Sequence, residues 1–367
     1  MPAHRIKIPI GKPDIGEEEI QAVVETMKSG WVSQGEKVEE LEVLFAKYCG
    51  AKHGVAVNTG TAALHIALAA LDIKEGDEVV TTPLSCVATT NPIVYQNAKP
   101  VFVDVDPVTL NIDPALIKRK ITPRTKAILP VHLFGHPVDL DPVTEIAEKH
   151  GLYVIEDVAQ AHGAKYKGKR VGTFGHISCF SFYADKGITT VEGGMALTND
   201  TDLAERMRMM RSFGMDESRK FHHPILGYNY KMSDIHSAIG LVQLQKLDHY
   251  IQSRRKNIEY LRERVNHPEL TLPTEQDYAF SVYYVCQILV KKGRDRIVEY
   301  LEKNGIETRP FLSFIPEQPI YRKYEYNLNE YEIARNANRT GFYVSNSPLL
   351  SDNELDYLAS TLISFFK

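Results

Sequence analysis

The sequence has little cysteine and no long apolar stretch. Only four of its 367 residues are cysteine, and none of the four belongs to a C-x-x-C pair. This spacing argues against a disulfide framework or a zinc site and favours reduced, buried thiols. No segment approaches the roughly 20 apolar residues of a membrane span, and the first residues lack the apolar core of a signal peptide. We therefore expect no membrane association and a cytoplasmic location.

Charge of one sign is not concentrated anywhere in the chain. The 43 basic and 47 acidic residues give a net charge of -4, and no run of five or six like charges occurs. Nucleic acids and anionic membranes attract proteins with basic patches, so neither is an expected partner. A small anionic substrate remains compatible with this composition.

Three familiar site signatures are missing or incomplete. The dinucleotide-binding fingerprint G-x-G-x-x-G is absent. Residues 163–170, GAKYKGKR, imitate a phosphate-binding P-loop, but Arg170 stands where a Mg²⁺-binding serine or threonine belongs. No H-E-x-x-H motif or paired Cys/His cluster indicates a catalytic metal, so we predict no metal.

Strand-like and helix-like segments alternate through residues 53–157, which predicts βαβ units and a mainly parallel sheet covered by helices. The expected strands are apolar runs, as burial on both faces of a sheet requires. A helical pattern from Ser233 to about Val265 is either a spine between two domains or two helices with a bend. The expected architecture is an α/β fold with a large domain (residues 1–245) and a smaller C-terminal α+β domain (residues 246–367).

The first motif with chemical meaning is N-T-G-T-A-A-L at residues 58–64, between the apolar strand GVAV and a helix. A glycine turn that leads into a helix exposes unpaired backbone N–H groups at the positive end of the helix dipole, and such a turn can bind phosphate. The pattern is equally typical of an ordinary turn in which Thr59 or Thr61 caps the helix. Taken alone, the motif favours the ordinary turn.

The second motif is Y-V-I-E-D at residues 153–157, an apolar strand that ends in two carboxylates. Ligands dock at the carboxyl edge of a parallel sheet, and a desolvated acid there needs a cationic partner. A pyridinium nitrogen would supply that charge to Asp157. Two alternatives stay open, namely that Asp157 caps the next helix or binds Mg²⁺.

The third motif is S-F-Y-A-D-K-G-I-T-T-V-E-G-G at residues 181–194. Most lysines are solvated surface groups. Lys186, however, follows an apolar strand and precedes a turn rich in glycine and threonine, a setting that removes water from the amine and suits Schiff-base chemistry.

A phosphate turn, an acid and a lysine in this order resemble the fold-type I pyridoxal-phosphate enzymes, specifically the DegT/StrS-type sugar-nucleotide aminotransferases. The resemblance covers nearly the whole chain and includes W-V-S-Q-G, V-H-L-F-G-H-P, V-I-E-D-V-A-Q-A-H-G-A and G-Y-N-Y-K-M-S-D-I-H-S-A-I-G-L-V-Q-L. It implies the cofactor pyridoxal 5'-phosphate.

The resemblance also implies a role for each matching residue. Lys186 would form the Schiff base and move the proton, Asp157 would pair with the ring nitrogen, and Gln160 would bond near the ring hydroxyl. The phosphate would lie in the Gly60 turn, held by Thr61, Ala62 and Ser181. Asn229 would reach the phosphate of the neighbouring subunit's cofactor, so the expected active unit is a homodimer with shared sites.

Three further positions complete the predicted site. Cys86 stands where relatives usually have an aromatic residue stacked on the cofactor ring, a contact worth about 0.5–1.5 kcal/mol beyond area burial. Arg309 is a predicted contact for the donor carboxylate or a substrate phosphate, because its planar fork suits both, although a plain surface charge is equally compatible. Trp31, in the W-V-S-Q-G loop, is the other predicted substrate contact.

Relatives that remove a sugar hydroxyl without delivering an amine carry histidine in place of the lysine, so Lys186 implies transamination. ITTVEGG resembles relatives that act at C4 of the hexose, and V-H-L-F-G-H-P and G-I-E-T-R-P resemble GDP-perosamine synthases. The implied reaction moves an amino group from glutamate to C4 of a nucleotide-linked 4-keto-6-deoxy sugar, for a surface polysaccharide or glycoconjugate. Two alternatives stay open: an aminotransferase for a C3-keto sugar or cyclitol ketone, and a non-catalytic cofactor-binding regulator, which the missing aromatic residue at Cys86 suggests.

Overall fold

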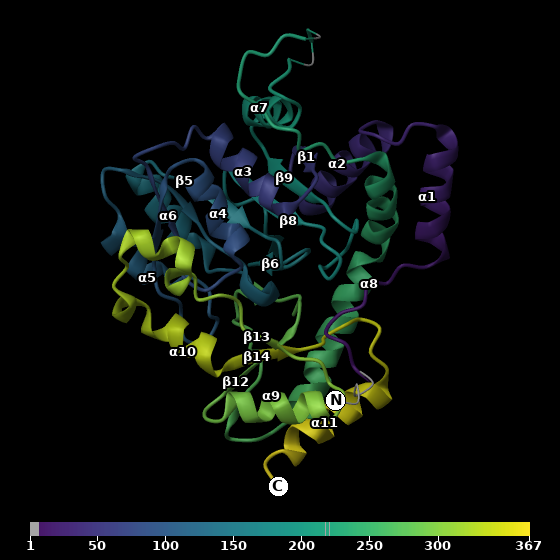
Figure 1. Ribbon diagram of the computed structural model, residues 1–367, viewed down its shortest axis with the longest axis vertical. Helices are drawn as coiled ribbons and strands as arrows, with labels where there is room; N and C mark the ends of the chain where they lie inside the picture. The colour runs from purple at the N-terminus through teal and green to yellow at the C-terminus, as the bar shows by residue number, and fades with distance from the viewer. Residues whose placement is uncertain (1–6, 217, 220) are drawn as a thin grey trace.

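The computed structural model describes residues 7–216, 218–219 and 221–367. A seven-stranded sheet forms the centre of its upper part (Figure 1). In spatial order the strands are β1 (His53–Val57), β9 (Gly194–Thr198), β8 (Ile177–Ser181), β5 (Tyr153–Asp157), β4 (Thr125–Leu129), β2 (Glu78–Thr81) and β3 (Lys99–Phe102). Every strand except β9 runs in the same direction, and β9 is antiparallel to both of its neighbours. The predicted mainly parallel α/β sheet is therefore confirmed.

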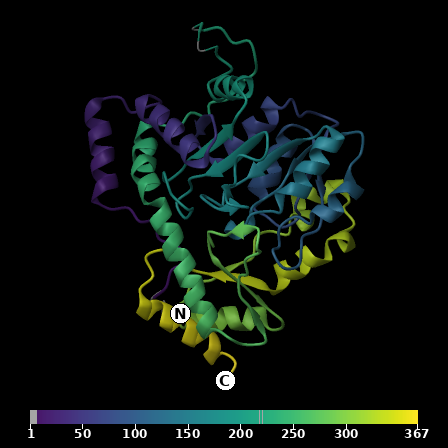
Figure 2. The same ribbon diagram turned by 180° about the vertical axis from the view of Figure 1, so that it is seen from behind.

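Both faces of this sheet are buried. Successive side chains of a strand point to opposite faces, and in β4 Ala127 and Leu129 belong to one hydrophobic core while Ile128 belongs to the other. The first core includes side chains of α3 (Gly60–Ala70), α4 (Val87–Tyr95), α7 (Thr201–Arg211) and α10 (Glu332–Thr340). The second core includes side chains of α2 (Glu36–Cys49), α5 (Pro114–Ile117), α6 (Leu140–His150) and α8 (Asp234–Arg264). The sheet is thus the middle of three layers, as Figures 1 and 2 show from opposite sides.

One unbroken helix of 31 residues, α8, runs from the large sheet to the lower part of the molecule (Figure 2). The expectation of a spine is confirmed, and Ser233 caps the helix by accepting a hydrogen bond from the His236 N–H. The lower core contains a small antiparallel sheet, ordered β10 (Leu270–Thr271), β12 (Cys286–Val290), β14 (Gly341–Val344) and β13 (Arg309–Pro310), with α9 (Arg294–Lys303) and α11 (Asp352–Ser364).

The lower core and the first core of the large sheet each include side chains from a segment that is distant in sequence. The predicted boundary at residue 245 falls inside α8. Ile8, near the start of the described chain, pairs with Ile306 and lies in the lower core. Residues 311–337, in contrast, contribute several side chains to the first core of the large sheet. Each core is therefore completed by a segment that is distant in sequence.

Two segments form shorter elements than their sequence patterns predict, and the incomplete P-loop motif is not a P-loop in the structure. The strand-like stretch FSVYYVCQILV forms only β11 (Ala279–Phe280) and β12, and the helix expected near residue 115 is the single turn of α5. The P-loop-like segment is a small hairpin of β6 (Lys165–Tyr166) and β7 (Lys169–Arg170), which pairs with β11. No helix follows that loop directly, so the similarity to a P-loop is accidental.

Helix α1 (Glu17–Ser29) directs apolar residues outward. Ile20 and Met27 are 50% and 59% exposed, whereas Glu19 is 1% exposed. The amide of Gln243 and the amine of Lys246 each donate to Glu19 Oε1 at 2.8 Å, so a buried carboxylate attaches α1 to α8. Ile20, Val23, Val24 and Met27 recur at helical spacing, which predicts the helix correctly, but Ile20 and Met27 do not face the protein's own core.

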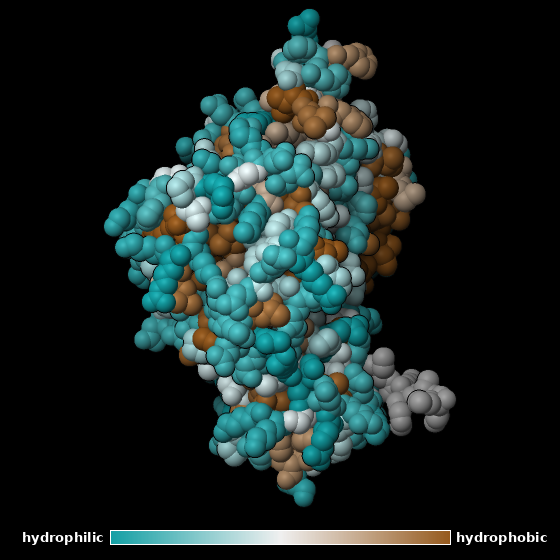
Figure 3. Space-filling view, turned by 60° about the vertical axis from the view of Figure 1, so that its left-hand side comes forward, coloured by the Kyte–Doolittle hydropathy of each residue, from teal (hydrophilic) through white to brown (hydrophobic). Residues whose placement is uncertain are grey.

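The face seen in Figure 3 is mostly hydrophilic with scattered hydrophobic side chains, and a larger hydrophobic group lies along the upper right-hand edge of that view. Within the described ranges, none of the helices has both the length and the apolar content that crossing a bilayer requires.

Candidate active site

A cavity of about 340 Å³ lies at the carboxyl ends of the parallel strands. The turns after β1, β2, β5 and β8 form one side of it, and Tyr284 and Tyr343 from the lower part of the molecule form the other. Seven of the residues predicted from sequence line this cavity: Gly60, Thr61, Cys86, Asp157, Gln160, Ser181 and Lys186. In the part of the chain that the structure describes, no group of three or more potential metal-ligating side chains is found.

The turn between β1 and α3 has the form of a phosphate site. Thr59 is the N-cap of α3, and its hydroxyl accepts the Ala62 N–H at 3.0 Å. Among the described residues no acceptor is found for the N–H groups of Gly60 and Thr61, which lie at the positive end of the helix dipole. The Ser181 side chain approaches so closely that a Cβ on Gly60 would lie 2.7 Å from Ser181 Cβ. Only glycine allows this contact. The contact brings the N–H groups of Gly60 and Thr61 close to the hydroxyl of Ser181.

Ala62 is placed differently from its neighbours in this turn. Its N–H is already bonded to Thr59, and its side chain is buried in the first core. Its predicted contact with the phosphate stays a prediction.

Asp157 ends β5 with its carboxylate buried, at 4% exposure. Thr89 Oγ1 donates to Asp157 Oδ2 at 2.8 Å, and the Ala159 N–H donates to Oδ1 at 3.1 Å. Ser85 in turn lies 2.7 Å from Thr89, hydroxyl to hydroxyl. Burial raises the pKa of Asp157, although the bond from Thr89 opposes the rise. An acid in this position is stabilised by a positive ligand, as a pyridinium nitrogen would be.

The preceding acid, Glu156, serves the fold instead. Its carboxylate is fully buried and accepts the N–H groups of Gly172, Phe174 and Gly175, each at 2.8 Å. His132 Nε2 lies 3.1 Å from the same carboxylate, while His132 Nδ1 accepts the Val138 N–H, so Nε2 carries the proton. Burial opposes ionisation, but His132 and the backbone donors outweigh it and lower the pKa of Glu156. The two adjacent acids therefore have separate tasks.

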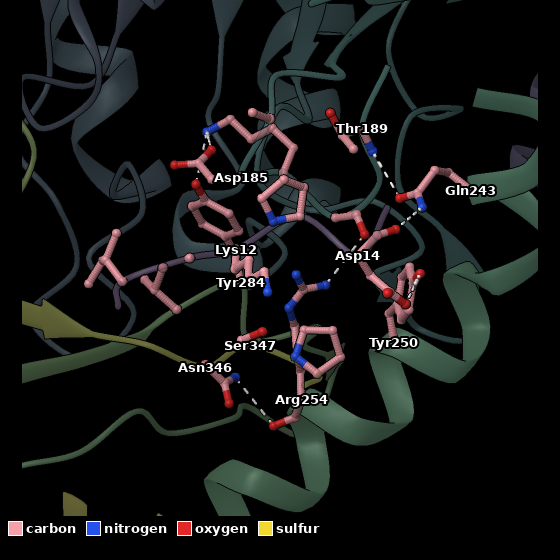
Figure 4. Close-up of a pocket in the computed structure, with 18 of the residues that line it drawn as sticks. Lys12, Asp14, Asp185, Thr189, Gln243, Tyr250, Arg254, Tyr284, Asn346 and Ser347 are labelled. Atoms are coloured by element: carbon pink, nitrogen blue, oxygen red, sulfur yellow. Dashed lines mark hydrogen bonds and ion pairs between the residues drawn. The ribbon is translucent and has the colours of Figure 1, made fainter. Parts of the chain in front are cut away.

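Lys186 lies in the loop after β8, on the wall of the cavity. Its side chain is 17% exposed, and its amine is 3.3 Å from the hydroxyl of Tyr284 and 3.8 Å from the carboxylate of Asp185. Figure 4 shows Asp185 and Tyr284 next to each other at this place. Burial and the Asp185 carboxylate raise the pKa of Tyr284 well above its usual value, so its phenol stays protonated. The amine thus has a fixed polar partner and little contact with water.

Gln160 and Cys86 complete the ring-sized part of the cavity. Gln160 Oε1 accepts the Phe134 N–H at 2.8 Å, which fixes the amide and leaves its NH₂ end as a donor. Cys86 is the N-cap residue of α4 and is exposed. Its thiol replaces the aromatic residue expected there.

The other predicted contacts lie outside this cavity. Trp31 is 64% exposed, and Arg309 is paired with Glu307 at 2.7 Å, its side chain 52% exposed. Asn229 accepts a hydrogen bond from Lys231 at 2.7 Å and is not part of the cavity wall of its own chain. The roles given to these three residues stay predictions.

Sequence reasoning missed Thr89, Tyr284 and Tyr343. Thr89 is one turn into α4, and nothing in V-A-T-T-N marks it as the partner of an acid 68 residues away. Tyr284 and Tyr343 belong to the lower part of the molecule, and Tyr284 is 98 residues from the lysine that it contacts. Only the folded chain brings these side chains together.

The cavity fits pyridoxal phosphate on its own chemistry. Its wall includes unpaired N–H donors suited to a phosphate, a buried acid that forms no ion pair within 4 Å among the described residues, and a lysine whose side chain is 17% exposed. Bound here, the cofactor supplies an aldehyde for the amine of Lys186 and a ring that withdraws electrons.

Comparison with known proteins identifies the family of this chain. Residues 13–363 match the DegT/DnrJ/EryC1/StrS aminotransferase family. The chain is 42% identical over 327 residues to a GDP-perosamine synthase of Caulobacter vibrioides, covering 86% of this chain and 87% of that protein. It is 38% identical over 363 residues to a GDP-perosamine synthase of Escherichia coli, covering 98% of each. The PLP form of Spr1654 from Streptococcus pneumoniae superposes with a TM-score of 0.93 at 28% identity, covering 98% of both chains. The chain thus belongs to the DegT/DnrJ/EryC1/StrS family and is a pyridoxal-phosphate-dependent sugar aminotransferase.

Proposed function

We propose that the protein transfers the amino group of glutamate to C4 of a nucleotide-linked 4-keto-6-deoxyhexose, with GDP as the preferred nucleotide. The observation that carries this proposal is the position of Lys186 in the cavity that also holds Asp157 and the Gly60 turn. Lysine is the residue that transamination requires at this position.

Each residue of the site has a defined task in this proposal. Asp157, held by Thr89, keeps a positive charge on the ring nitrogen. The amine of Lys186 accepts and returns the proton, and Tyr284, 3.3 Å away, keeps that amine in place. Tyr284 and Tyr343 cover the cavity from the lower side and exclude water from it.

The choice of C4 as the reacting carbon and of GDP as the nucleotide rests on sequence similarity to relatives. The segment ITTVEGG begins two residues after Lys186 and resembles relatives that act at C4 of the hexose. V-H-L-F-G-H-P contributes Phe134 to the cavity wall and resembles GDP-perosamine synthases, two of which are among the similar proteins described above. A position at the cavity wall is where residues that distinguish one sugar from another are expected.

A substrate panel tests the proposal. The purified protein with bound cofactor is incubated with glutamate and with GDP-, UDP- or TDP-linked 4-keto-6-deoxyhexose, a 3-keto isomer, or an inosose. We expect release of 2-oxoglutarate and a 4-amino sugar, identified by NMR, with the GDP substrate turned over fastest. Turnover of the 3-keto sugar or the inosose in preference to every 4-keto sugar would refute it. Lys186→Ala should be inactive, and Lys126→Ala, which alters an exposed lysine on β4, serves as the matched control.

We also infer that the active unit is a homodimer whose sites are shared. Ile20, Met27 and Val43 on α1 and α2 are between 50% and 66% exposed, and apolar side chains of this size favour a covered position. Asn229, which the family pattern assigns to the phosphate, lies outside the cavity of its own chain. Both observations are explained if a second copy covers α1 and α2 and receives Asn229.

Mixing two inactive variants tests this arrangement. In a dimer of Lys186→Ala with Asn229→Ala, one of the two shared sites has an intact lysine and an intact asparagine. If the chains exchange at random, we expect a 1:1 mixture to regain about a quarter of wild-type activity, because half the dimers are mixed and each has one working site. If Asn229 acts within its own chain, the mixture regains no activity.

A further inference from the structure

Arg254 points into a second, smaller cavity beside the first. This cavity has a volume of about 40 Å³ and lies between the N-terminal segment, α8 and the small sheet. Figure 4 shows the guanidinium of Arg254 among Lys12, Asp14 and Tyr250. Asp185, Lys186, Tyr284 and Tyr343 line both cavities, so the two adjoin at the reactive lysine.

The positive charge of Arg254 is buried and forms no ion pair among the described residues, although Asp14 and Asp185 line the same cavity. Arg254 is 7% exposed. Among the described residues its guanidinium makes one hydrogen bond, a long one from Nη1 to the Gly187 carbonyl at 3.5 Å. Its Nε has no partner, and no carboxylate lies within 4 Å of it among the described residues. Burial lowers the pKa of Arg254 to about 10, which leaves it charged at neutral pH. A buried charge of this kind costs several kcal/mol unless an anion pairs with it.

Among the described residues one other arginine, Arg211, is deeply buried, and its contacts show what a structural role requires. Arg211 is 2% exposed, and its guanidinium is paired with Glu42 and also donates to the Ala56 carbonyl. Arg254 has no such partner, although Asp14 lines the same cavity. Asp14 Oδ2 instead accepts the hydroxyl of Tyr250 at 2.8 Å. The fold therefore leaves the charge of Arg254 available to a ligand.

Size and charge indicate which anion fits. The second cavity is the smaller of the two, at about 40 Å³ against about 340 Å³ for the first, which suits a small group such as a carboxylate. Lys12 adds a second positive charge, and Asn346 and Ser347 add polar groups. A carboxylate between two cations and polar donors is well bound.

We propose that Arg254, assisted by Lys12, binds the side-chain carboxylate of a dicarboxylic amino donor whose amino group lies at Lys186. This inference rests on the proposed function, which makes glutamate the donor. It gives the site a reason to prefer a donor with two carboxylates over one with a single carboxylate.

Binding of unreactive acids tests the proposal without turnover. Glutarate has two carboxylates and butyrate has one, and neither has an amino group. Calorimetric titration of the cofactor-loaded wild type should give an affinity for glutarate at least about tenfold higher than for butyrate. Arg254→Gln should remove that preference, Lys12→Gln should reduce it, and neither should change the affinity for GDP. Arg264→Gln, an exposed change near the end of the same helix, should behave as wild type.

Three results would overturn the proposal: equal affinities of the wild type for the two acids, an unchanged glutarate preference in Arg254→Gln, or a loss of GDP affinity in that variant. If Arg254→Gln fails to fold, the glutarate and butyrate affinities of the wild type and of the exposed Lys12→Gln variant still test the proposal. The sugar panel is independent of this test. Glutarate preference without any turnover of keto sugars would refute the proposed function alone, and turnover without the preference would refute this inference alone.

Discussion

Gly60→Ala is the change that tests the phosphate turn most directly. A Cβ at this position would lie 2.7 Å from Ser181 Cβ and 3.1 Å from Ser181 Cα, and these atoms belong to the end of β8 rather than to a flexible side-chain tip. The turn or the strand must therefore shift by several tenths of an ångström. Such overpacking typically costs about 1–3 kcal/mol of stability. The shift also moves the Gly60 and Thr61 N–H groups away from Ser181 Oγ.

The cost in cofactor affinity follows from the hydrogen bonds that are displaced. One bond to a charged phosphate contributes about 1.5–3 kcal/mol, so losing one weakens binding by roughly 10- to 150-fold. Titration of the apoprotein with pyridoxal phosphate, followed by its visible absorbance, measures this loss.

Gly16→Ala is the matched control for this experiment. Gly16 is the N-cap residue of α1, and a Cβ there meets only Glu19 Oε2, at 3.7 Å. Its loss of stability should be at most about 1 kcal/mol, and its cofactor affinity should equal that of the wild type. If Gly60→Ala binds the cofactor within twofold of wild type, the Gly60 turn does not hold the phosphate and the reasoning is wrong.

Three further changes concern the buried acids. Asp157→Asn should keep the visible absorbance of the lysine-bound cofactor but lower turnover by up to about 10³-fold. The reason is that a carboxylate about 4 Å from a charge contributes about 4 kcal/mol near a protein surface. Unchanged turnover would contradict the role of Asp157. Thr89→Val removes a bond that lowers the pKa of Asp157, so the acidic limb of the pH–activity profile should move to higher pH, and an unmoved limb would show that Thr89 does not act on this acid. Glu156→Gln should cost about 3–5 kcal/mol of unfolding free energy at pH 7, because it breaks a buried network. The folded pKa of Glu156 lies below its ordinary value of 4.5, so its stabilisation is present above that value and is lost as the pH falls through the folded pKa. Denaturant titrations of both proteins at pH 7 and pH 3.5 should therefore show a smaller difference at the lower pH.

The parts of the site that sequence could predict are those that lie at the ends of apolar strands. Gly60 and Lys186 follow such strands within a few residues and Asp157 is the last residue of one, and parallel strands bring their carboxyl ends to one edge of a sheet. The burial of both sheet faces likewise follows from apolar runs, as in β4. These inferences need only local pattern and one general rule of sheet topology.

The parts that sequence could not predict depend on contacts between distant segments. Thr89, Tyr284 and Arg254 reach the site from α4, the small sheet and α8, and no spacing in the sequence relates them to Lys186. The direction of β9 was equally hidden, because the loop that joins it to β8 could support a parallel or an antiparallel return. The apolar row of α1 predicted a helix but not that Ile20 would face outward.

The buried charges of the chain can be sorted by whether its own residues satisfy them. Glu156 receives three N–H groups and a histidine, so nothing more is required and its role is structural. Asp157 receives one hydroxyl and one N–H, and burial still raises its pKa, so a cation must complete its surroundings. Arg254 receives one long contact and no carboxylate in the described chain. Since a buried charge left without partners costs several kcal/mol, a fold tolerates one mainly where a ligand supplies the missing group. On that reasoning the cofactor completes the surroundings of Asp157, the amino donor proposed above completes those of Arg254, and both groups lie in cavities that share Lys186.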